Sequence, residues 1–392
     1  MTATYLAQSL SHRVGEFIAL RRDIHAHPEI AFEEHRTSAL VAGKLESWGY
    51  EVTSGLGGTG VVGTLRKGSG KRAIGLRADM DALPITEATG HAWASRTAGL
   101  MHACGHDGHT ATLLSAARHI AEDVDFDGTL HLIFQPAEEG GGGALRMMAD
   151  GLFERFPCDA VFALHNSPGL PTGHFAFRSG PAMASSDYVT IRLHGIGGHG
   201  ALPHTTADPL VAAASVVMAL QTIVARNVDP LQSAVVTVGA LHAGQANNVI
   251  PQVAQLELSV RALAPQVRAL LRERLHELVQ QQAASFRVRA EIDWREGYAV
   301  LVNSERETAL ASSVARRLFG DAKVVDPAPA LMASEDFAFM LEKVPGCYLF
   351  VGNGAEGTPG GCMVHNPSYD FNDEIIEPAT RFWAALVQEC LR

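Results

Sequence analysis

The sequence predicts an α/β fold with a second domain inserted into the first. Short apolar strand segments alternate with amphipathic helices in residues 1–183 and again in residues 294–392. In residues 184–293, strand and helix patterns follow each other in a different order. Alternation of strands and helices is typical of a mostly parallel sheet that is covered by helices. We therefore expect a discontinuous domain, residues 1–183 and 294–392, around an inserted domain, residues 184–293.

The elements of the discontinuous domain follow from hydrophobic periodicity. Near the start of the chain, apolar residues recur at helical spacing, as at Leu40, Val41 and Leu45. Short, uninterrupted apolar stretches are typical of buried strands. The expected helices are residues 14–25, 34–48, 144–148, 305–319, 336–343 and 374–391. The expected strands are residues 60–65, 72–79, 129–134, 160–164 and 347–351.

The inserted domain is expected to fold as a unit of its own. Its strand and helix patterns come in the order β-α-β-β-α-β. The six segments are residues 188–193, 208–226, 234–241, 252–261, 264–284 and 287–292. This order belongs to the split βαβ, ferredoxin-like arrangement, which closes its own four-stranded sheet.

Composition excludes several classes of function. The 392 residues carry 31 basic and 42 acidic side chains, a net charge of −11, and no basic cluster, which argues against a nucleic-acid partner. The longest apolar runs, such as residues 210–220, fall short of the roughly 20 residues that cross a membrane. We expect no membrane span, and residues 1–20 do not resemble a signal peptide. Five scattered cysteines form no disulfide framework, so a reducing cytoplasm is the simplest location.

Acids, histidines and a cysteine gather at the ends of the predicted strands or at the start of a helix. Ligands of open α/β sheets bind outside the carboxyl ends of the strands, so we expect these side chains to lie close together. They come from five separate places in the chain. They are Asp79 and Asp81, Cys104 and His106, Glu138 and Glu139, His165, and His365.

These residue types suit a pair of metal ions. Imidazole, thiolate and carboxylate are ligands of zinc and related divalent metals. Two such ions can share a water molecule and lower its pKa. In the Glu138–Glu139 pair, one carboxylate can bind metal while its neighbour takes the proton of the water. The glycines at 140–143 allow the backbone to come close to the site.

Other interpretations explain single residues but not the convergence. A lone histidine at a strand end is more often structural, a lone Cys104 is more often a small buried residue, and Asp79 fits either role. Residues 58–63 match a dinucleotide fingerprint, yet they lead into a strand and a turn rather than opening a helix. No Gly-x-Ser-x-Gly elbow is present. A non-catalytic metal-binding protein is the remaining alternative, and the intact Glu138 argues against it.

At these residues the sequence resembles the aminoacylase/carboxypeptidase family of binuclear metallohydrolases. Within it, the sequence is most similar to the amidohydrolase branch of hippurate hydrolases, N-acyl-amino-acid deacylases and auxin-conjugate hydrolases. The matching stretches follow the family order over nearly the whole chain. They are RADMDALPI (77–85), MHACGHDGHTA (101–111), FQPAEEGGGGA (134–144), HGIGGHGALPH (194–204), NNVIP (247–251), SEDFAFM (334–340) and HNPSYDFND (365–373).

The resemblance implies a zinc-peptidase-like catalytic domain and assigns roles to its residues. Glu138 matches the general base of the branch, and Asp81 matches a supporting carboxylate of the catalytic site. The wider family has His-x-Asp where this chain has Asp79-Met80-Asp81, and a bridging Asp where it has Cys104. The branch shares both features, but they leave the role of Asp79 open. The implied metal ligands are Cys104, His106, Glu139, His165 and His365.

For the inserted domain, the resemblance implies a lid that also forms the dimer. His199 matches a residue that reaches across the dimer to polarise the substrate carbonyl, and Asn248 and Arg261 match substrate contacts. The expected reaction is hydrolysis of an N-acyl-L-amino acid with two divalent ions, manganese, zinc, nickel or cobalt. A dipeptidase or carboxypeptidase with the same site is the alternative. The acyl group, the amino acid, and the choice between dimer and tetramer stay open.

Overall fold

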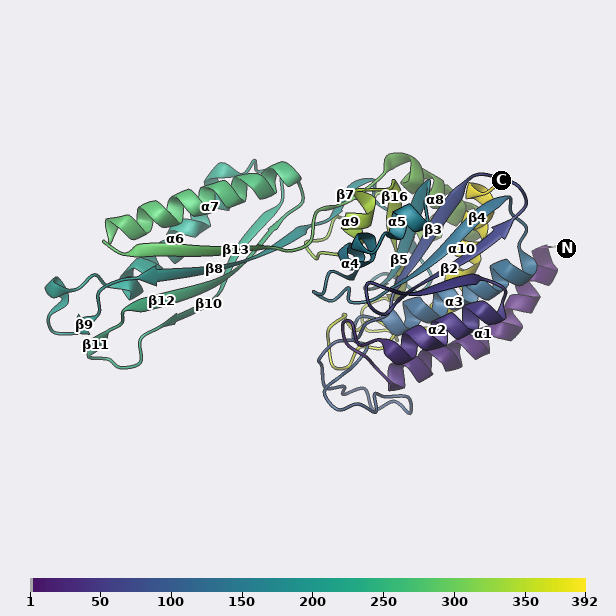
Figure 1. Cartoon of the computed structure of the whole chain (residues 1–392), viewed down its shortest axis with the longest axis horizontal. Helices are drawn as coiled ribbons and strands as arrows, with labels where there is room; N and C mark the ends of the chain where they lie inside the picture. The colour runs from purple at the N-terminus through teal and green to yellow at the C-terminus, as the bar shows by residue number, and fades with distance from the viewer. Residues whose placement is uncertain (1–2) are drawn as a thin grey trace. The chain divides into compact units, whose positions relative to one another are not determined.

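The computed structural model describes residues 3–392, with side chains from residue 13 onward. Its contacts divide the chain into two units, which correspond to separate hydrophobic cores. The first unit comprises the residues up to Gly180, Val302–Pro329 and Phe339–Arg392. The second unit comprises Pro181–Leu301 and Ala330–Ala338. Figure 1 labels many of the elements of both units.

An eight-stranded mixed sheet forms the centre of the first unit. Its order is β1 (Glu51–Leu56), β2 (Gly60–Lys67), β4 (Gly128–Gln135), β3 (Ala73–Asp79), β5 (Ala160–Pro168), β16 (Gly346–Gly354), β6 (Phe175–Ala176) and β15 (Val324–Val325). Neighbours within β4-β3-β5-β16 are parallel, whereas β1, β2 and β4 pair antiparallel. Every residue of β4 is buried, as in a central strand covered on both faces. The predicted α/β fold is confirmed; the sheet is mixed, with a parallel centre and antiparallel pairs toward both edges.

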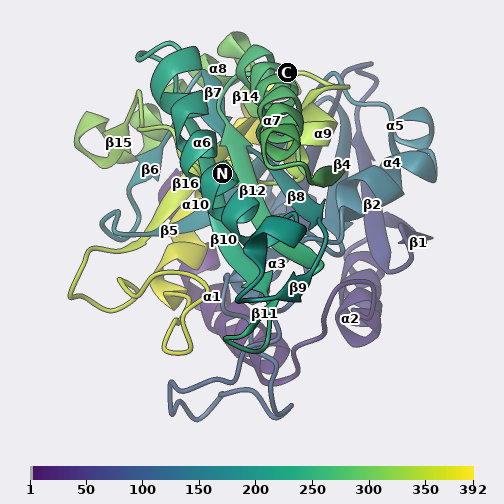
Figure 2. The same ribbon diagram turned by 90° about the vertical axis from the view of Figure 1, so that its left-hand side faces the viewer.

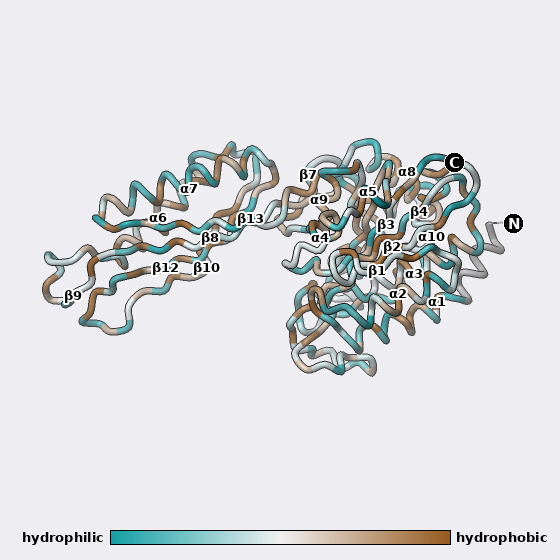
Figure 3. Tube along the Cα trace, in the orientation of Figure 1, coloured by the Kyte–Doolittle hydropathy of each residue, from teal (hydrophilic) through white to brown (hydrophobic). Residues whose placement is uncertain are grey.

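Helices cover this sheet and complete its core. They are α1 (Ala3–Ala26), α2 (His35–Ser47), α3 (His106–Asp123), α4 (Gly143–Ala149), α5 (Leu152–Arg155), α8 (Glu305–Phe319) and α10 (Ile376–Cys390). α1, α3 and α10 pack against one another, α2 packs on β1 and β2, and α8 packs on β16. In Figure 3 the strands at the centre of the sheet are largely brown, the colour of apolar residues. The short strands β7 (Gly180–Met183) and β14 (Leu301–Asn303) pair with each other, and α9 spans Phe337–Leu341.

A buried ionic network fixes the start of α3, where two of the predicted site residues lie. Asp107 Oδ2 contacts Nδ1 of His25 at 2.9 Å and Nη1 of Arg21 at 3.4 Å, and all three side chains are fully buried. Burial alone would lower the pKa of His25, but the charge of Asp107 and hydrogen bonds to Asp107 and Glu87 raise it to about 9. A charged His25 therefore ties α1 to the first turn of α3.

The second unit is a four-stranded antiparallel sheet with two helices. The sheet order is β10 (Ala234–Ala243), β12 (Val253–Ala262), β8 (Ser185–His194) and β13 (Arg289–Glu296). The helices are α6 (Pro209–Asn227) and α7 (Pro265–Ser285), and Figures 1 and 2 both show them side by side on one face of the sheet. The order along the chain, β8-α6-β10-β12-α7-β13, is the predicted ferredoxin-like order.

Alternation of side chains explains why the helices cover only one face of that sheet. Along β12, every second residue is buried and the residues between them are half-exposed or exposed. α7 buries a single stripe with a spacing of four residues, and Figure 3 shows the matching alternation of brown and teal along it. The buried residues of α7 are Val267, Leu271, Leu275, Val279 and Ala283.

One helix among the described residues, α6, is long and apolar enough to cross a membrane by length and composition. The whole helix is longer than the apolar run at residues 210–220, which by itself is too short to cross a membrane. Core helices pass the same test, and α6 buries Val216, Leu220 and Ile223 in the core of the second unit.

Several element boundaries differ from the sequence expectation. α1 begins at Ala3, before the expected residue 14, and α9 is shorter than the helix expected over residues 336–343. β1 was not expected, because it is an edge strand with a mostly exposed, weakly alternating pattern. The second unit also includes Ala330–Ala338, which lies outside the predicted domain at residues 184–293. The domain limits and the lid role stay predictions.

Candidate metal centre

The parallel centre of the first sheet brings the predicted site residues together. β3 ends at Asp79 and β4 ends three residues before Glu138, while β5 carries His165 near its carboxyl end. Because β3, β4 and β5 are parallel, these ends meet at one edge of the sheet. His106 opens α3 at the same edge, as its contacts with the strand residues show.

Cys104 reaches this edge through a turn that requires glycine. Gly105, between Cys104 and His106, has φ 90°, and an added Cβ would lie 2.3 Å from Oη of Tyr369. Only glycine adopts this left-handed conformation without strain and leaves the space that Tyr369 needs. The turn places the thiol and the imidazole on either side of a single residue.

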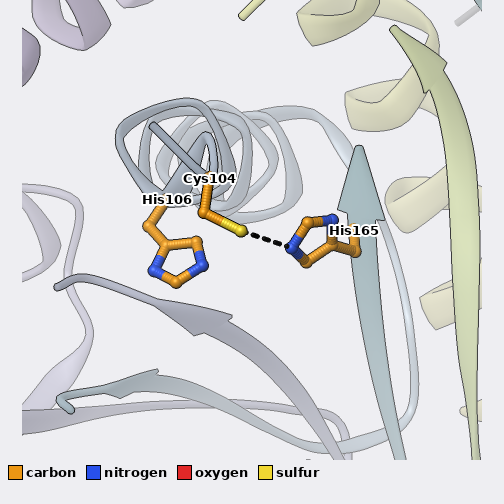
Figure 4. A group of neighbouring side chains, drawn as sticks. All are labelled: Cys104, His106 and His165. Carbon is orange, nitrogen blue, oxygen red and sulfur yellow. Dashed lines mark hydrogen bonds between the residues drawn. The ribbon is translucent and has the colours of Figure 1, made fainter. Parts of the chain in front are cut away.

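Two groups of ligand atoms share the sulfur of Cys104. In the first group, one ligand atom each of Cys104, His106 and His165 lie within 4.8 Å of one another, and Sγ of Cys104 is 3.4 Å from Nε2 of His165 (Figure 4). In the second group, ligand atoms of Cys104, Glu139 and His365 also lie within 4.8 Å of one another, and Nε2 of His365 is 3.1 Å from Oε1 of Glu139. A shared sulfur between two such groups has the arrangement of a bridging ligand for two cations.

The chemistry of these donors fits divalent metal ions. Nε2 of His106 is buried and makes no hydrogen bond, which is costly unless a cation binds its lone pair. Burial and the charge of Glu139 raise the pKa of Cys104, so a thiolate at this position requires a compensating positive charge. The first group offers two imidazoles and the sulfur, the second an imidazole, a carboxylate and the same sulfur, and both are ligand sets for zinc or a related ion.

Hydrogen bonds on the far side of His106 and His165 orient the nitrogens that are predicted to bind metal. His106 contacts Oδ1 of Asp81 through Nδ1 at 3.2 Å, and His165 donates from Nδ1 to the carbonyl oxygen of Asn166 at 2.6 Å. Both contacts leave Nε2 directed toward the centre. Oδ2 of Asp81 also accepts the backbone N–H of Glu139 at 2.9 Å. Asp81 therefore holds two of the predicted ligands at once, as outer partners of metal ligands do.

Asp79 belongs to a second layer behind the ligands. Its carboxylate pairs with Nη1 of Arg77 at 2.6 Å and with Nδ1 of His109 at 2.6 Å. Nε2 of His109 in turn accepts the backbone N–H of Asn166 at 3.0 Å. Ligand atoms of Asp79, His106 and His109 also lie within 4.8 Å of one another. However, both ring nitrogens of His109 already make hydrogen bonds, to Asp79 and to Asn166. This geometry favours a structural role for Asp79 and His109.

Three residues of this layer were missed by sequence reasoning. Asn166 donates from Nδ2 to the carbonyl oxygen of Cys104 at 2.7 Å, and Tyr369 donates to Oδ1 of Asn166 at 2.9 Å. His109 and Tyr369 lie in the family-matching stretches 101–111 and 365–373, but no role was predicted for either. Asn166 carried no signal, because its contacts join segments far apart in the chain.

The family of the chain follows from its similarity to a known protein family. Residues 75–389 match the description Peptidase family M20/M25/M40. The chain belongs to this family. The predicted family resemblance and its zinc-peptidase-like fold are thereby confirmed, and divalent metal ions are the cofactors that such a site takes.

Individual members of the M20 family match nearly the whole chain. A hippurate hydrolase of Campylobacter jejuni is 44% identical over 378 residues, covering 96% of this chain and 97% of its own. An N-acetyl-L-cysteine deacetylase of Bacillus subtilis is 40% identical over 375 residues, covering 95% of this chain and 88% of its own. The crystal structure of a dinuclear metal-binding M20 peptidase of Bacillus subtilis has a TM-score of 0.84 at 32% identity, covering 97% of this chain and 99% of that one.

Three other predicted site residues lie in the second unit. His199, at the end of β9 (Gly198–His199), is exposed and pairs with Val249 of β11 (Val249–Ile250). The carbonyl oxygen of Asn248 accepts the N–H of Gly200 at 2.7 Å, so His199 and Asn248 occupy adjoining loops. Arg261 lies near the opposite end of β12 and donates from Nη1 to the carbonyl oxygen of Met332 at 2.9 Å. Their roles toward a substrate stay predictions.

Metal loading of this M20 protein is expected to release protons. Hydrogen bonds to Cys104 and Glu139 raise the pKa of His365 to about 10 in the metal-free protein. A metal ion binds only the deprotonated imidazole, so below that pH loading expels its proton. The apparent affinity should rise about tenfold per pH unit for each proton released between about pH 6 and about pH 8. Calorimetric titration of the stripped protein with zinc, in buffers of different ionisation enthalpy, measures both quantities.

Two variants test the source of these protons. His365→Ala should release fewer protons than the parent protein. His35→Ala should not change the release, although His35 is also an exposed histidine beside a glutamate. An affinity that does not change with pH would contradict the assignment of His365 as a ligand.

Proposed function

We propose that this chain hydrolyses the amide bond of N-acyl-L-amino acids, giving a carboxylic acid and a free amino acid. The observation that carries the proposal is the sulfur of Cys104, which two groups of ligand atoms share at the carboxyl edge of the sheet. The two relatives described above, a hippurate hydrolase and an N-acetyl-L-cysteine deacetylase, support this substrate class by name. The substrate is therefore a small acylated amino acid.

Five residues of the first unit would hold two divalent ions. The grouping of donor atoms supports His106 and His165 on one side of Cys104 and Glu139 and His365 on the other. When bound, such ions lower the pKa of a water molecule and polarise the amide carbonyl. Manganese, zinc, nickel and cobalt all suit this donor set.

Glu138 is the proposed general base. Its side chain is 7% exposed, and one of its oxygens lies within 4.8 Å of ligand atoms of His106 and Glu139. Its carboxylate takes a proton from the attacking water and passes it to the leaving amine. Asp81 keeps His106 and Glu139 in place while this transfer occurs.

Residues of the second unit are proposed to bind the substrate. Arg261 would pair with the carboxylate of the substrate. This charge-assisted contact would select acylated amino acids over amides that lack a carboxylate. Asn248, which adjoins His199 and lies at the other end of β12 from Arg261, would contact the substrate from the partner subunit. The exposed imidazole of His199 would polarise the amide carbonyl from the partner subunit of a dimer.

The second unit also offers a surface for that dimer. β10 is an edge strand, whose free backbone groups can pair with another chain. Near it, α6 exposes Val211 at 49% and Met218 at 71%, and β10 exposes Leu241 at 42%. Apolar side chains beside an unpaired edge are typical of a protein interface. We infer a homodimer formed through this surface, with a tetramer as the alternative assembly.

The cytoplasm is the proposed location. All five cysteines are free thiols, which suits a reducing compartment. A thiolate ligand also survives best where oxidants are scarce.

Activity after metal removal and reloading tests the proposed reaction. The stripped protein should be inactive, and reloading with manganese, zinc, cobalt or nickel should restore cleavage of acyl-amino acids. The panel contains N-acetyl-, N-benzoyl- and indole-acetyl-amino acids together with several dipeptides. Cleavage of dipeptides alone would instead assign the chain as a dipeptidase or carboxypeptidase.

Replacement of the proposed base tests its role. Glu138→Gln removes the proton acceptor but keeps the shape of the side chain, so kcat should fall by about 10²–10⁴. Metal content, measured by atomic emission, and the melting temperature should stay close to those of the parent protein. Turnover near the parent value would rule out Glu138 as the base.

Subunit exchange tests the proposed role of His199. Glu138→Gln and His199→Ala proteins should each be nearly inactive, because each lacks one half of every composite site. Mixed under conditions that exchange subunits, they should form heterodimers with one intact site and regain part of the activity. Heterodimers that form but stay inactive would contradict the cross-dimer contact.

A further inference from the structure

The turn that presents Glu138 has an unfavourable backbone conformation. Ala137, directly before Glu138, has φ 53°, in the left-handed region that side chains other than glycine avoid. Such a conformation is less favourable than the right-handed one, so neighbouring groups must hold it. Ala137 is fully buried, and its surroundings can therefore be identified.

Glu34 supplies one side of that support. It directly precedes α2 in the sequence, 103 residues away from Ala137. Its Oε1 accepts the backbone N–H of Ala137 at 2.9 Å and the N–H of Phe32 at 3.1 Å. Its Oε2 accepts the hydroxyl of Thr59 at 2.5 Å.

The hydrogen bonds of Glu34 are all with uncharged donors. The side chain is fully buried, and the three donors are two amides and a hydroxyl, all of them neutral. Burial raises the pKa of Glu34, because no water solvates its charge. An uncharged acceptor of the same length would therefore make the same contacts with the turn.

The other side of the turn is fixed independently. The carbonyl oxygen of Ala137 accepts the N–H of Gly143 at 3.1 Å, and Asp81 accepts the N–H of Glu139 at 2.9 Å. A Cβ at Gly143 would lie 1.7 Å from the carbonyl oxygen of Pro136, so the chain closes here as tightly as glycine allows. Glu138 thus lies between two anchored residues, Ala137 and Glu139.

We propose that Glu34 is a positioning residue that sets the direction of the Glu138 carboxylate through the backbone of Ala137. The inference rests on the proposed function, since it assumes that Glu138 is the general base. Among the described residues, Glu34 belongs to none of the groups of possible metal ligands. It acts by holding a strained turn in the one conformation that aims the base at the water.

Two substitutions separate reach from charge. Glu34→Asp keeps the charge but withdraws the acceptor by one methylene, so the N–H of Ala137 loses its partner. We expect kcat to fall by about 10- to 100-fold, the effect of a displacement on the order of 1 Å, with KM changed less than about twofold. Glu34→Gln loses the charge but keeps an oxygen at the same distance, and its NH2 group can donate to Thr59. Its kcat should stay within about threefold of the parent value.

Glu29→Asp is the matched control. Glu29 lies in the same segment, and its carboxylate accepts the N–H groups of Arg36 and Thr37 at the start of α2. Shortening it disturbs α2 by the same one methylene but leaves the turn at Ala137 untouched. Its kcat should match the parent value, whatever the change in melting temperature. Bound metal, counted by atomic emission, should be equal in all variants.

Three results would overturn the proposal. One is a Glu34→Asp protein with the parent kcat, and another is a Glu34→Gln protein as impaired as Glu34→Asp, since charge would then matter. The third is equal loss of kcat in Glu34→Asp and Glu29→Asp. If instead Glu138→Gln retains turnover, the proposed function fails at its base, which distinguishes that failure from a failure of Glu34.

Discussion

The first unit depends on one constraint. Buried donor atoms that carry a lone pair or a negative charge destabilise the protein unless a cation binds them. Nε2 of His106 is buried without a hydrogen bond, and Cys104 and Glu139 bring further donor atoms to the same place. An arrangement of this kind is costly in a protein without metal. Groups around it, such as Asp81, are therefore best understood as the framework that keeps the donor atoms in position until ions bind.

The sheet explains how distant residues reach that point. Parallel pairing of β3, β4, β5 and β16 places their carboxyl ends at one edge, and each ending can then contribute a side chain. The local backbone completes the arrangement where the strands alone cannot. Gly105 and the left-handed residues Ala137 and His365 turn the chain sharply next to predicted ligands or the predicted base. Strained residues are expected to cluster at functional sites in this way.

The fold and the donor residues could be predicted because they leave local signals. Strand and helix periodicity predicted most of the elements, and ligand-type residues at strand ends predicted the groups around Cys104. The supporting residues leave no such signal. Glu34 resembles an ordinary residue at a helix start, yet it holds Ala137 from 103 positions away, and Tyr369 contacts Asn166 across 203 positions. Contacts of that kind are set by tertiary packing, which periodicity does not report.

Anomalous X-ray diffraction from crystals of the metal-loaded protein tests the central claim most directly. The account predicts two peaks in each chain, about 3.5–4 Å apart, as in other two-metal sites. Cys104 should lie between the peaks, His106 and His165 beside one, and Glu139 and His365 beside the other. A single peak, or a peak on His109 in place of the Cys104 pair, would contradict the account.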